Sequence, residues 1–310
     1  MFTAALLITL STLTTAQPGL QPPHRNTPAQ RATPMTPESL TAQIKSGASD
    51  AIATAAKLGD AAVPTLDQHM LDKDPDIRLM TLRCFDAVGG EHAIKAGVNA
   101  LLDDDAQVAS RAAVLLHRHP PKGYNHQLFG AFNQSREAAV RIEIPKVVGR
   151  IGTADDIRLW TTVLPTVKEP EVRDGVMIGL ARMGHEPSRD WFKGKLAAAD
   201  GPAALPWLEA AEYMDDPWVL PTLGKLLDKR SEVYTASADF KPVQVRVCDL
   251  AAHVIFTITK HKVEFAVSQR RYLETEVDEA RKAAGGEQPP GFSITSPAPS
   301  DPAPRTPLTR

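Results

Sequence analysis

Apolar residues recur along most of the chain with the spacing of amphipathic helices. After Arg78, apolar positions follow at intervals close to three and share one helix face: Leu79, Leu82, Phe85 and Val88. Gly89-Gly90 then ends the helix, because glycine adopts a left-handed backbone at little cost. A second apolar run follows at Ile94, Val98, Leu101 and Leu102, before an acidic stretch. The pattern predicts a pair of helices between residues 74 and 102.

This helix pair repeats along the chain. Arg78 is followed eleven residues later by Gly89, and the same offset recurs at Arg141–Gly152 and Arg173–Gly184. With weaker copies included, the equivalent positions are residues 48, 78, 109, 141, 173, 204 and 246, where Arg246 has Thr257 at the glycine position. The steps are 30 to 32 residues, except for a last step of 42. Such a period predicts an all-α fold: an α-solenoid, a superhelical stack of about seven antiparallel helix pairs.

The repeated unit resembles the short HEAT-like repeats associated with phycobilisome lyases. The residues that carry the resemblance are Asp74-x-x-Ile77-Arg78 with Gly89, Val140-Arg141 with Gly152, and Glu169-x-x-Val172-Arg173 with Gly184. The last unit is similar to the closing repeat of exported bacterial HEAT-repeat proteins, although its turn at 259–262 lacks their glycine. The resemblance implies an α-solenoid over about residues 38–284. It leaves function open, because such repeats serve scaffolds, adaptors and lyase accessory proteins.

Four segments are expected from the composition along the chain. Residues 1–16 are apolar and then small, which is typical of a signal peptide, although the usual basic start is missing. The run is shorter than the ~20 apolar residues of a membrane-spanning helix. Residues 17–37 and 285–310 are rich in Pro and are expected to be a disordered linker and tail, flanking the repeat array at 38–284. We therefore expect export to the periplasm or the outside of the cell.

The net charge bears on the possible partners, and the positions of the two cysteines bear on a disulfide. The formal net charge of −2 gives no electrostatic reason to expect nucleic acid or an anionic membrane as a partner. Cys84 and Cys248 lie five units apart, beyond the ~7 Å between Cα atoms that a disulfide allows. Both are therefore expected to be small buried core residues.

The residues that bear chemistry have structural explanations. His117 and His119 lie on different helix faces beside a Pro-Pro break, which does not suit a metal site, so surface or capping roles are favoured. The acidic residues at unit junctions, such as 103–105, are best explained as helix caps. The repeated arginines fit a ladder of ion pairs between units better than a basic groove, because two units lack them. We expect no catalytic, cofactor-binding or metal-binding residues.

The pattern breaks at an insertion, Asp228–Pro242. Insertions in solenoids project as loops, often from the binding face. Four residues of this insertion are the predicted contact residues for a partner: Lys229, Arg230, Tyr234 and Phe240. The competing interpretation is a tolerated loop whose aromatic side chains pack on the stack.

Two functions remain open on this sequence. The first is a non-enzymatic scaffold for protein–protein interaction at the cell envelope, which holds a protein or peptide partner across several units. The alternative is an accessory factor, lyase-like or chaperone-like, that presents a substrate or chromophore to another protein. A structural spacer of the envelope without a discrete site is a third possibility.

Overall fold

The computed structural model describes residues 35–238, 241–261 and 272–285. The helices of the first four units are α1 (Pro37–Lys45), α2 (Asp50–Leu58), α3 (Val63–His69), α4 (Pro75–Val88), α5 (Gly90–Ala100), α6 (Ala106–Arg118), α7 (Asn125–Gln134), α8 (Ala138–Gly149) and α9 (Ala154–Val163). Those of the last three are α10 (Pro170–Met183), α11 (Glu186–Ala198), α12 (Leu205–Met214), α13 (Leu220–Leu226), α14 (Val247–Ile258) and α15 (Glu274–Ala284).

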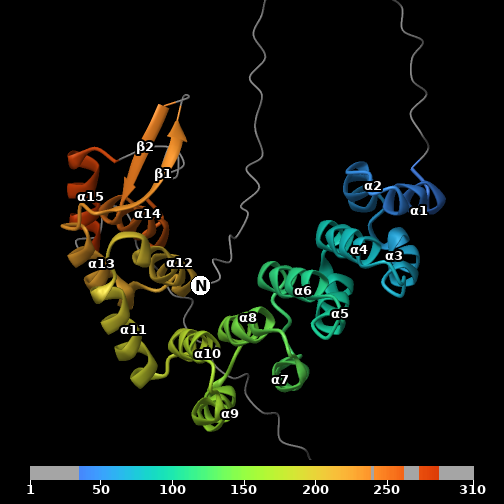
Figure 1. Ribbon diagram of the computed structural model, residues 1–310, viewed down its shortest axis with the longest axis horizontal. Helices are drawn as coiled ribbons and strands as arrows, with labels where there is room; N and C mark the ends of the chain where they lie inside the picture. Colours follow the sequence, from blue (N-terminus) through green and yellow to red (C-terminus); the bar gives the residue numbers. More distant parts are fainter. Residues whose placement is uncertain (1–34, 239–240, 262–271, 286–310) are drawn as a thin grey trace, which may run out of the picture.

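The helices form an open arc with an inner and an outer layer (Figure 1). The even-numbered helices from α2 to α14 line the concave side, and each contacts the next even-numbered helix. The odd-numbered helices from α3 to α15 form the convex side, so the described residues make seven helix pairs after α1. The arrangement confirms the predicted α-solenoid of about seven pairs.

The apolar faces of the helix pairs meet between the two layers. The buried hydrophobic residues form two clusters, and both include residues of α10. The largest fully buried side chains include Phe85, Phe132, Trp160 and Phe192. Cys84 and Cys248 are free and buried in this interior, as predicted. Since no unit encloses its own core, each one is stabilised by its neighbours.

Acidic residues at the unit junctions cap helices and pair with arginines. The side chain of Asp74 caps α4, and that of Asp105 caps α6. Asp103 instead binds Arg78, 2.6 Å from Nη2, in an ion pair that joins two units. Arg141 likewise reaches Glu169 of the next unit at 2.8 Å. The predicted structural ladder is therefore present at these two positions, whereas Arg173 is exposed.

Two inner helices, α8 and α10, approach each other unusually closely. A Cβ atom on Gly175 would lie 2.7 Å from the carbonyl oxygen of Ile142, and one on Gly179 would lie 2.7 Å from the carbonyl carbon of Pro145. Both distances are shorter than real Cβ contacts, and both neighbours are backbone. Only glycine therefore permits this spacing at the centre of the arc.

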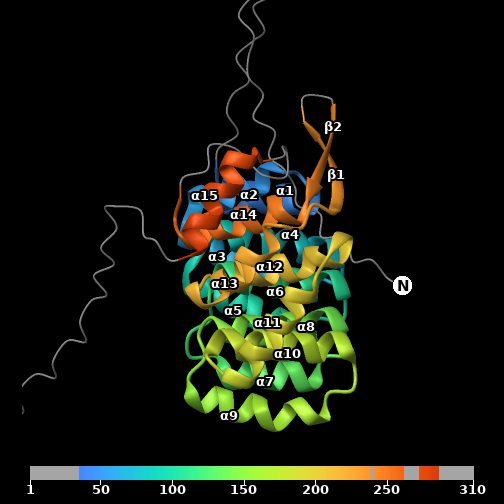
Figure 2. The ribbon, with the colours of Figure 1, turned by 90° about the vertical axis from the view of Figure 1, so that its left-hand side faces the viewer.

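The insertion forms a β-hairpin, so the expectation of a projecting loop is wrong. Strands β1 (Glu232–Ala238) and β2 (Lys241–Arg246) pair antiparallel, with Tyr234 opposite Val245, and the hairpin projects beyond the stack (Figure 2). The physical reason lies in the alternation of apolar and polar residues at Val243-Gln244-Val245, a strand pattern. The helical period of the rest of the chain concealed it.

The hairpin also corrects the register of the last unit. Thr257, which the repeat predicts at the helix-ending glycine position, lies inside α14. The left-handed residue is Lys260, with φ 58°, which corresponds to Gly89 at φ 75° and Gly184 at φ 100°. Arg78, Arg141 and Arg173 are each the fourth residue of their helix, whereas Arg246 precedes α14, so Arg246 is not their equivalent.

Parts of the predicted organisation fall outside the described residues. These are the signal peptide at 1–16, the linker as far as residue 34, and the tail after Gly285. Among the described helices, none is both long and apolar enough to span a membrane.

Candidate binding site on the concave face

A row of polar residues follows the inner helices along the arc. Its members are one residue from each of five successive inner helices or their ends, at steps of 32, 32, 32 and 31 residues: Asp86, Arg118, Arg150, Arg182 and Tyr213. Asp86 is held by the first arginine, since Arg118 Nη1 lies 2.5 Å from Asp86 Oδ2. The carboxylate is shared with Arg111 at 2.6 Å. The arginines of the next two units have no such carboxylate before them in the row.

Tyr213 is placed by the way α8 ends. The N–H of Arg150 donates to Val147 and Val148 and not to Lys146, which leaves the Lys146 carbonyl without its helical partner. The Tyr213 hydroxyl donates to that carbonyl and so ties α12 to α8 across α10. Gly149 makes room for it, because a Cβ atom there would collide with the hydroxyl oxygen. Burial raises the pKa of Tyr213, so the phenol stays protonated.

Two guanidinium groups lie over the ring of Tyr213. The Cζ atom of Arg182 is 4.7 Å from the ring centroid, and that of Arg150 is 5.5 Å from it. The ring of His117 approaches edge-on, with centroids 6.2 Å apart. Cations over an aromatic face are attracted by its quadrupole. The tyrosine therefore holds two like charges near one another without a carboxylate between them.

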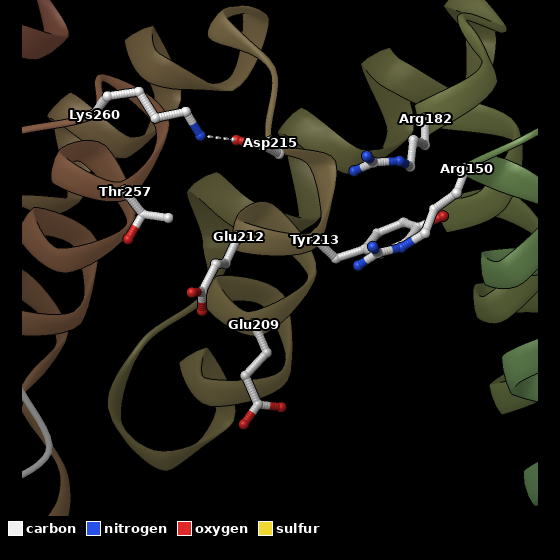
Figure 3. A pocket seen from close by; sticks show the side chains of 8 residues that line it. All are labelled: Arg150, Arg182, Glu209, Glu212, Tyr213, Asp215, Thr257 and Lys260. Carbon is white, nitrogen blue, oxygen red and sulfur yellow. Dashed lines mark hydrogen bonds and ion pairs between the residues drawn. The ribbon is translucent and has the colours of Figure 1, made fainter. Parts of the chain in front are cut away.

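These residues line an open hollow of about 390 Å³ (Figure 3). Arg150 and Arg182 lie beside Tyr213 on one side of the view, and the opposite side carries Thr257 and Lys260. The floor residues come from α12: Glu209, Glu212, Tyr213 and Asp215. The hollow thus spans the C-terminal ends of four inner helices, α8, α10, α12 and α14.

A second charged group lies behind Tyr213. Glu143 accepts from Lys146 Nζ at 2.7 Å, and its other oxygen lies 2.9 Å from His117 Nε2. Burial alone would raise the pKa of Glu143, but the His117 contact and the Lys146 charge outweigh it and lower the pKa to about 2. Desolvation raises the pKa of Glu209 against the opposing charge of Lys146, and Glu212 adds to the rise. The acidic residues of the hollow therefore repel one another, and this region favours a cation or a hydrogen-bond donor.

Backbone strain marks one wall of the hollow. Among the described residues, only Asp215 (φ 44°) and Lys260 (φ 58°) have positive φ without being glycine. Their side chains form an ion pair of 3.0 Å. Asp215 directly follows α12, as Gly184 directly follows α10, and Lys260 is the second residue after α14. Strain of this kind clusters at functional sites, so we count this pair as part of the candidate site.

Substitutions at Lys260 should separate strain from side-chain function. Lys260→Val is expected to lower the free energy of unfolding by about 1–2 kcal/mol, because a β-branched residue tolerates the left-handed backbone poorly. Lys260→Gly should change it by less than about 1 kcal/mol, since relief of strain offsets a weak surface ion pair. Urea unfolding followed by circular dichroism measures both. Equal losses in the two variants would show that the backbone conformation carries no cost.

The predicted contact residues of the insertion have structural partners. Lys229 Nζ donates to the carbonyl oxygens of Ala197 at 3.0 Å and Ala199 at 2.6 Å. Arg230 binds Glu274 at 2.8 Å. Tyr234 is half-buried against the C-terminal core, and burial raises its pKa, with the charge of Glu209 acting in the same direction.

Phe240, the fourth predicted contact residue, lies outside the described residues. The hairpin packs through β1 against the 3-10 turn at Gly201–Ala204, which precedes α12. A contact role for the four residues stays a prediction.

The histidines and acidic clusters follow their structural explanations. His119 caps the end of α6, with Nε2 3.1 Å from Asp86 Oδ1. Within the described residues, no three side chains of His, Cys, Asp or Glu converge as metal ligands would.

The comparisons with known proteins bear on the fold. No protein-family model and no curated protein matches the chain. Among solved structures, the complex of CpcE and CpcF of phycocyanin lyase from Nostoc sp. PCC7120 aligns with a TM-score of 0.52 and 16% sequence identity, covering 85% of this chain and 100% of the other. The chain has the fold of this neighbour. The likeness supports the HEAT-like helical-repeat architecture that the sequence predicts.

An engineered protein also aligns, with 17% identity over 81% of this chain and 68% of its own. Its TM-score is 0.29, and we draw no structural argument from it.

The row at the centre of the site was missed in the sequence. The arginine that defines the repeat lies near the start of each first helix, whereas the row lies eight or nine residues later, at the end of that helix. Its signal was present, because Arg118, Arg150 and Arg182 are separated by 32 residues each, like the units themselves. What the spacing does not show is that Tyr213 continues the row and stacks with two of the arginines.

Proposed function

We propose that the protein is a non-enzymatic accessory factor that holds one molecule on its concave face and presents it to a second protein. The observation that carries this proposal is the hollow around Tyr213, in which Arg150 and Arg182 lie without a carboxylate partner among the described residues. A rigid stack of helices suits such a role, because it supplies an extended, preformed surface. The phycocyanin lyase complex, which has this fold and consists of two proteins, gives the proposal a parallel.

The ionisable groups of the hollow suit binding better than catalysis. Lys260 is neutralised by Asp215, and the phenol of Tyr213 is used to hold α8. Of the groups that line the hollow, the two arginines keep free donors, and arginine does not give up its proton in proteins. They can orient a ligand by charge and hydrogen bonds. We therefore assign them to recognition.

The second candidate is a scaffold that binds a protein partner at the cell envelope without presenting a further molecule. The hairpin supports it, because β1 and β2 project beyond the stack. Location at the envelope rests on the apolar segment at 2–16 and remains our expectation.

Affinity capture from an envelope fraction with the full chain as bait tests the two candidates. The accessory role predicts a stable partner that is lost with Arg182→Gln and retained with Arg158→Gln, a control whose side chain is 81% exposed on α9. The scaffold role predicts instead that Tyr234→Ser weakens capture while Arg182→Gln does not. Visible absorbance of the purified protein adds a test for a bound chromophore. A partner held equally by all variants, or none at all, would contradict both roles.

A further inference from the structure

Arg182 has a donor that nothing in the described part of the molecule satisfies. Its Nη1 atom is buried, yet no hydrogen-bond acceptor lies within reach. Burial lowers the pKa of Arg182, and the neighbouring charge of Arg150 acts in the same direction. A buried charged donor without a partner costs more than a neutral one. The unpaired donor of Arg182 therefore destabilises the protein without a ligand. An acceptor atom of a ligand at that position would remove this destabilisation.

Arg111 also has a buried donor without a partner, its Nε atom, and burial lowers its pKa as well, but unlike Arg182 it forms an ion pair. Arg118 and Arg111 are bound by Asp86, and Arg78 is bound by Asp103. Within the described residues, Arg150 and Arg182 form no ion pair. The first arginine of the row, Arg118, is thus neutralised, whereas the next two, Arg150 and Arg182, keep their charge where they line the hollow.

We propose that Arg150 and Arg182 seat a single oxyanion, a carboxylate or phosphate group, of the molecule held on the concave face. The inference rests on the proposed function and names the chemistry of what is bound. A planar guanidinium presents paired N–H donors that match such oxygens, often two at a time. The ring of Tyr213 fixes both guanidinium groups before the ligand arrives, which lowers the entropic cost of binding.

The rest of the hollow limits the ligand to one such group. Glu209 and Glu212 lie below the two arginines (Figure 3), and their charges repel a second anion. A polyanion such as nucleic acid therefore does not fit. A carboxylate or phosphate that is followed by an amine, a guanidinium or an amide does fit, with its donor toward the two glutamates. A segment of a protein with an acidic group next to a basic or amide group has this chemistry.

Side-chain NMR of the full chain tests the seat. The Nε–Hε signals of Arg150 and Arg182 are followed during titration with inorganic phosphate and, separately, with glycylglycine, which carries one carboxylate and one ammonium. We expect saturable shifts of these two signals and none of the Arg158 signal. Sodium chloride at the same ionic strength should not reproduce them. Saturation by one probe alone identifies the phosphate or the carboxylate as the group that is held.

Two variants separate loss of probe binding from loss of folding. Arg182→Gln is expected to weaken binding of the probe by about tenfold or more, with an unchanged circular dichroism spectrum, and Arg150→Gln provides a second variant should the first not fold. Equal, non-saturating shifts with phosphate, glycylglycine and chloride would overturn the seat. If capture of a partner depends on Arg182 while no probe saturates, the oxyanion is wrong and the function stands. If the probes bind while no partner is captured, the proposed function fails.

Discussion

Asp249→Ala is expected to lower the free energy of unfolding by about 3–5 kcal/mol, the loss typical when one partner of a buried ion pair is removed. Asp249 is fully buried, and Arg246 is 3% exposed. Their carboxylate and guanidinium face each other in two hydrogen bonds, Nη2 to Oδ1 at 2.8 Å and Nε to Oδ2 at 3.0 Å. Without the carboxylate, the charge of Arg246 would remain in the interior with only peripheral partners.

The pair also joins three elements of the C-terminal end. Arg246 ends β2, Asp249 lies in the first turn of α14, and the backbone N–H of Tyr272 donates to Asp249 before α15. Arg246 further binds Glu274 of α15 at 3.1 Å. The hydrogen bond to Asp249 raises the pKa of Arg246, so the guanidinium stays charged in its buried position. Loss of Asp249 should therefore loosen the hairpin and the closing helix together.

Urea unfolding monitored by circular dichroism measures the loss. The matched control is Asp155→Ala, because Asp155 forms an exposed ion pair of 3.1 Å with Arg158 at the same i,i+3 spacing. That variant should change stability by less than about 1 kcal/mol. Similar small losses in both would show that the buried pair is not a structural anchor. The double change Arg246→Met with Asp249→Leu should recover part of the loss, since no unpaired charge remains.

This ion pair shows where the sequence was a good guide and where it was not. The repeat predicted the helix pairs, because each unit has the same apolar spacing and the same terminating residue. It fails in the last unit, where Arg246 follows an apolar β-branched residue, as Arg78 does, without being its structural equivalent. Arg246 instead precedes α14 and binds Asp249, so the match was between residue types and not between positions. The inserted hairpin shifts the position of the last unit within the repeat, and the residues around Arg246 give no sign of that shift.

The candidate site illustrates a different limit. Helical spacing predicts which residues share a face, and it could have placed Arg118, Arg150 and Arg182 in a row. It does not predict that α8 ends in a tighter turn and leaves the Lys146 carbonyl for Tyr213. That contact joins residues 67 positions apart along the chain. Whether Tyr213 reaches Lys146 depends on the distance between α8 and α10, and three-dimensional packing determines that distance.

Gly175 and Gly179 of α10 allow the short distance between α8 and α10. Gly179→Ala is therefore expected to destabilise the protein, although alanine usually stabilises a helix relative to glycine. Alanine normally stabilises a helix by up to about 1 kcal/mol relative to glycine. At residue 179 its Cβ would instead lie 2.7 Å from the carbonyl carbon of Pro145 and would collide with the oxygen of the same group. Both helices would have to move apart, so we expect a net loss of about 1–3 kcal/mol.

Gly194→Ala in α11 is the matched control and should raise the free energy of unfolding. No atom lies within 4 Å of a Cβ built at residue 194, and the residue is exposed. Urea unfolding should show a gain of up to about 1 kcal/mol for this variant. A Gly179→Ala protein as stable as the parent would show that α8 and α10 can separate freely. The separation matters beyond stability, because Tyr213 must span α10 to reach Lys146. A wider spacing should break that hydrogen bond, release the ring from Arg150 and Arg182, and weaken phosphate or glycylglycine binding in proportion to the loss of stability.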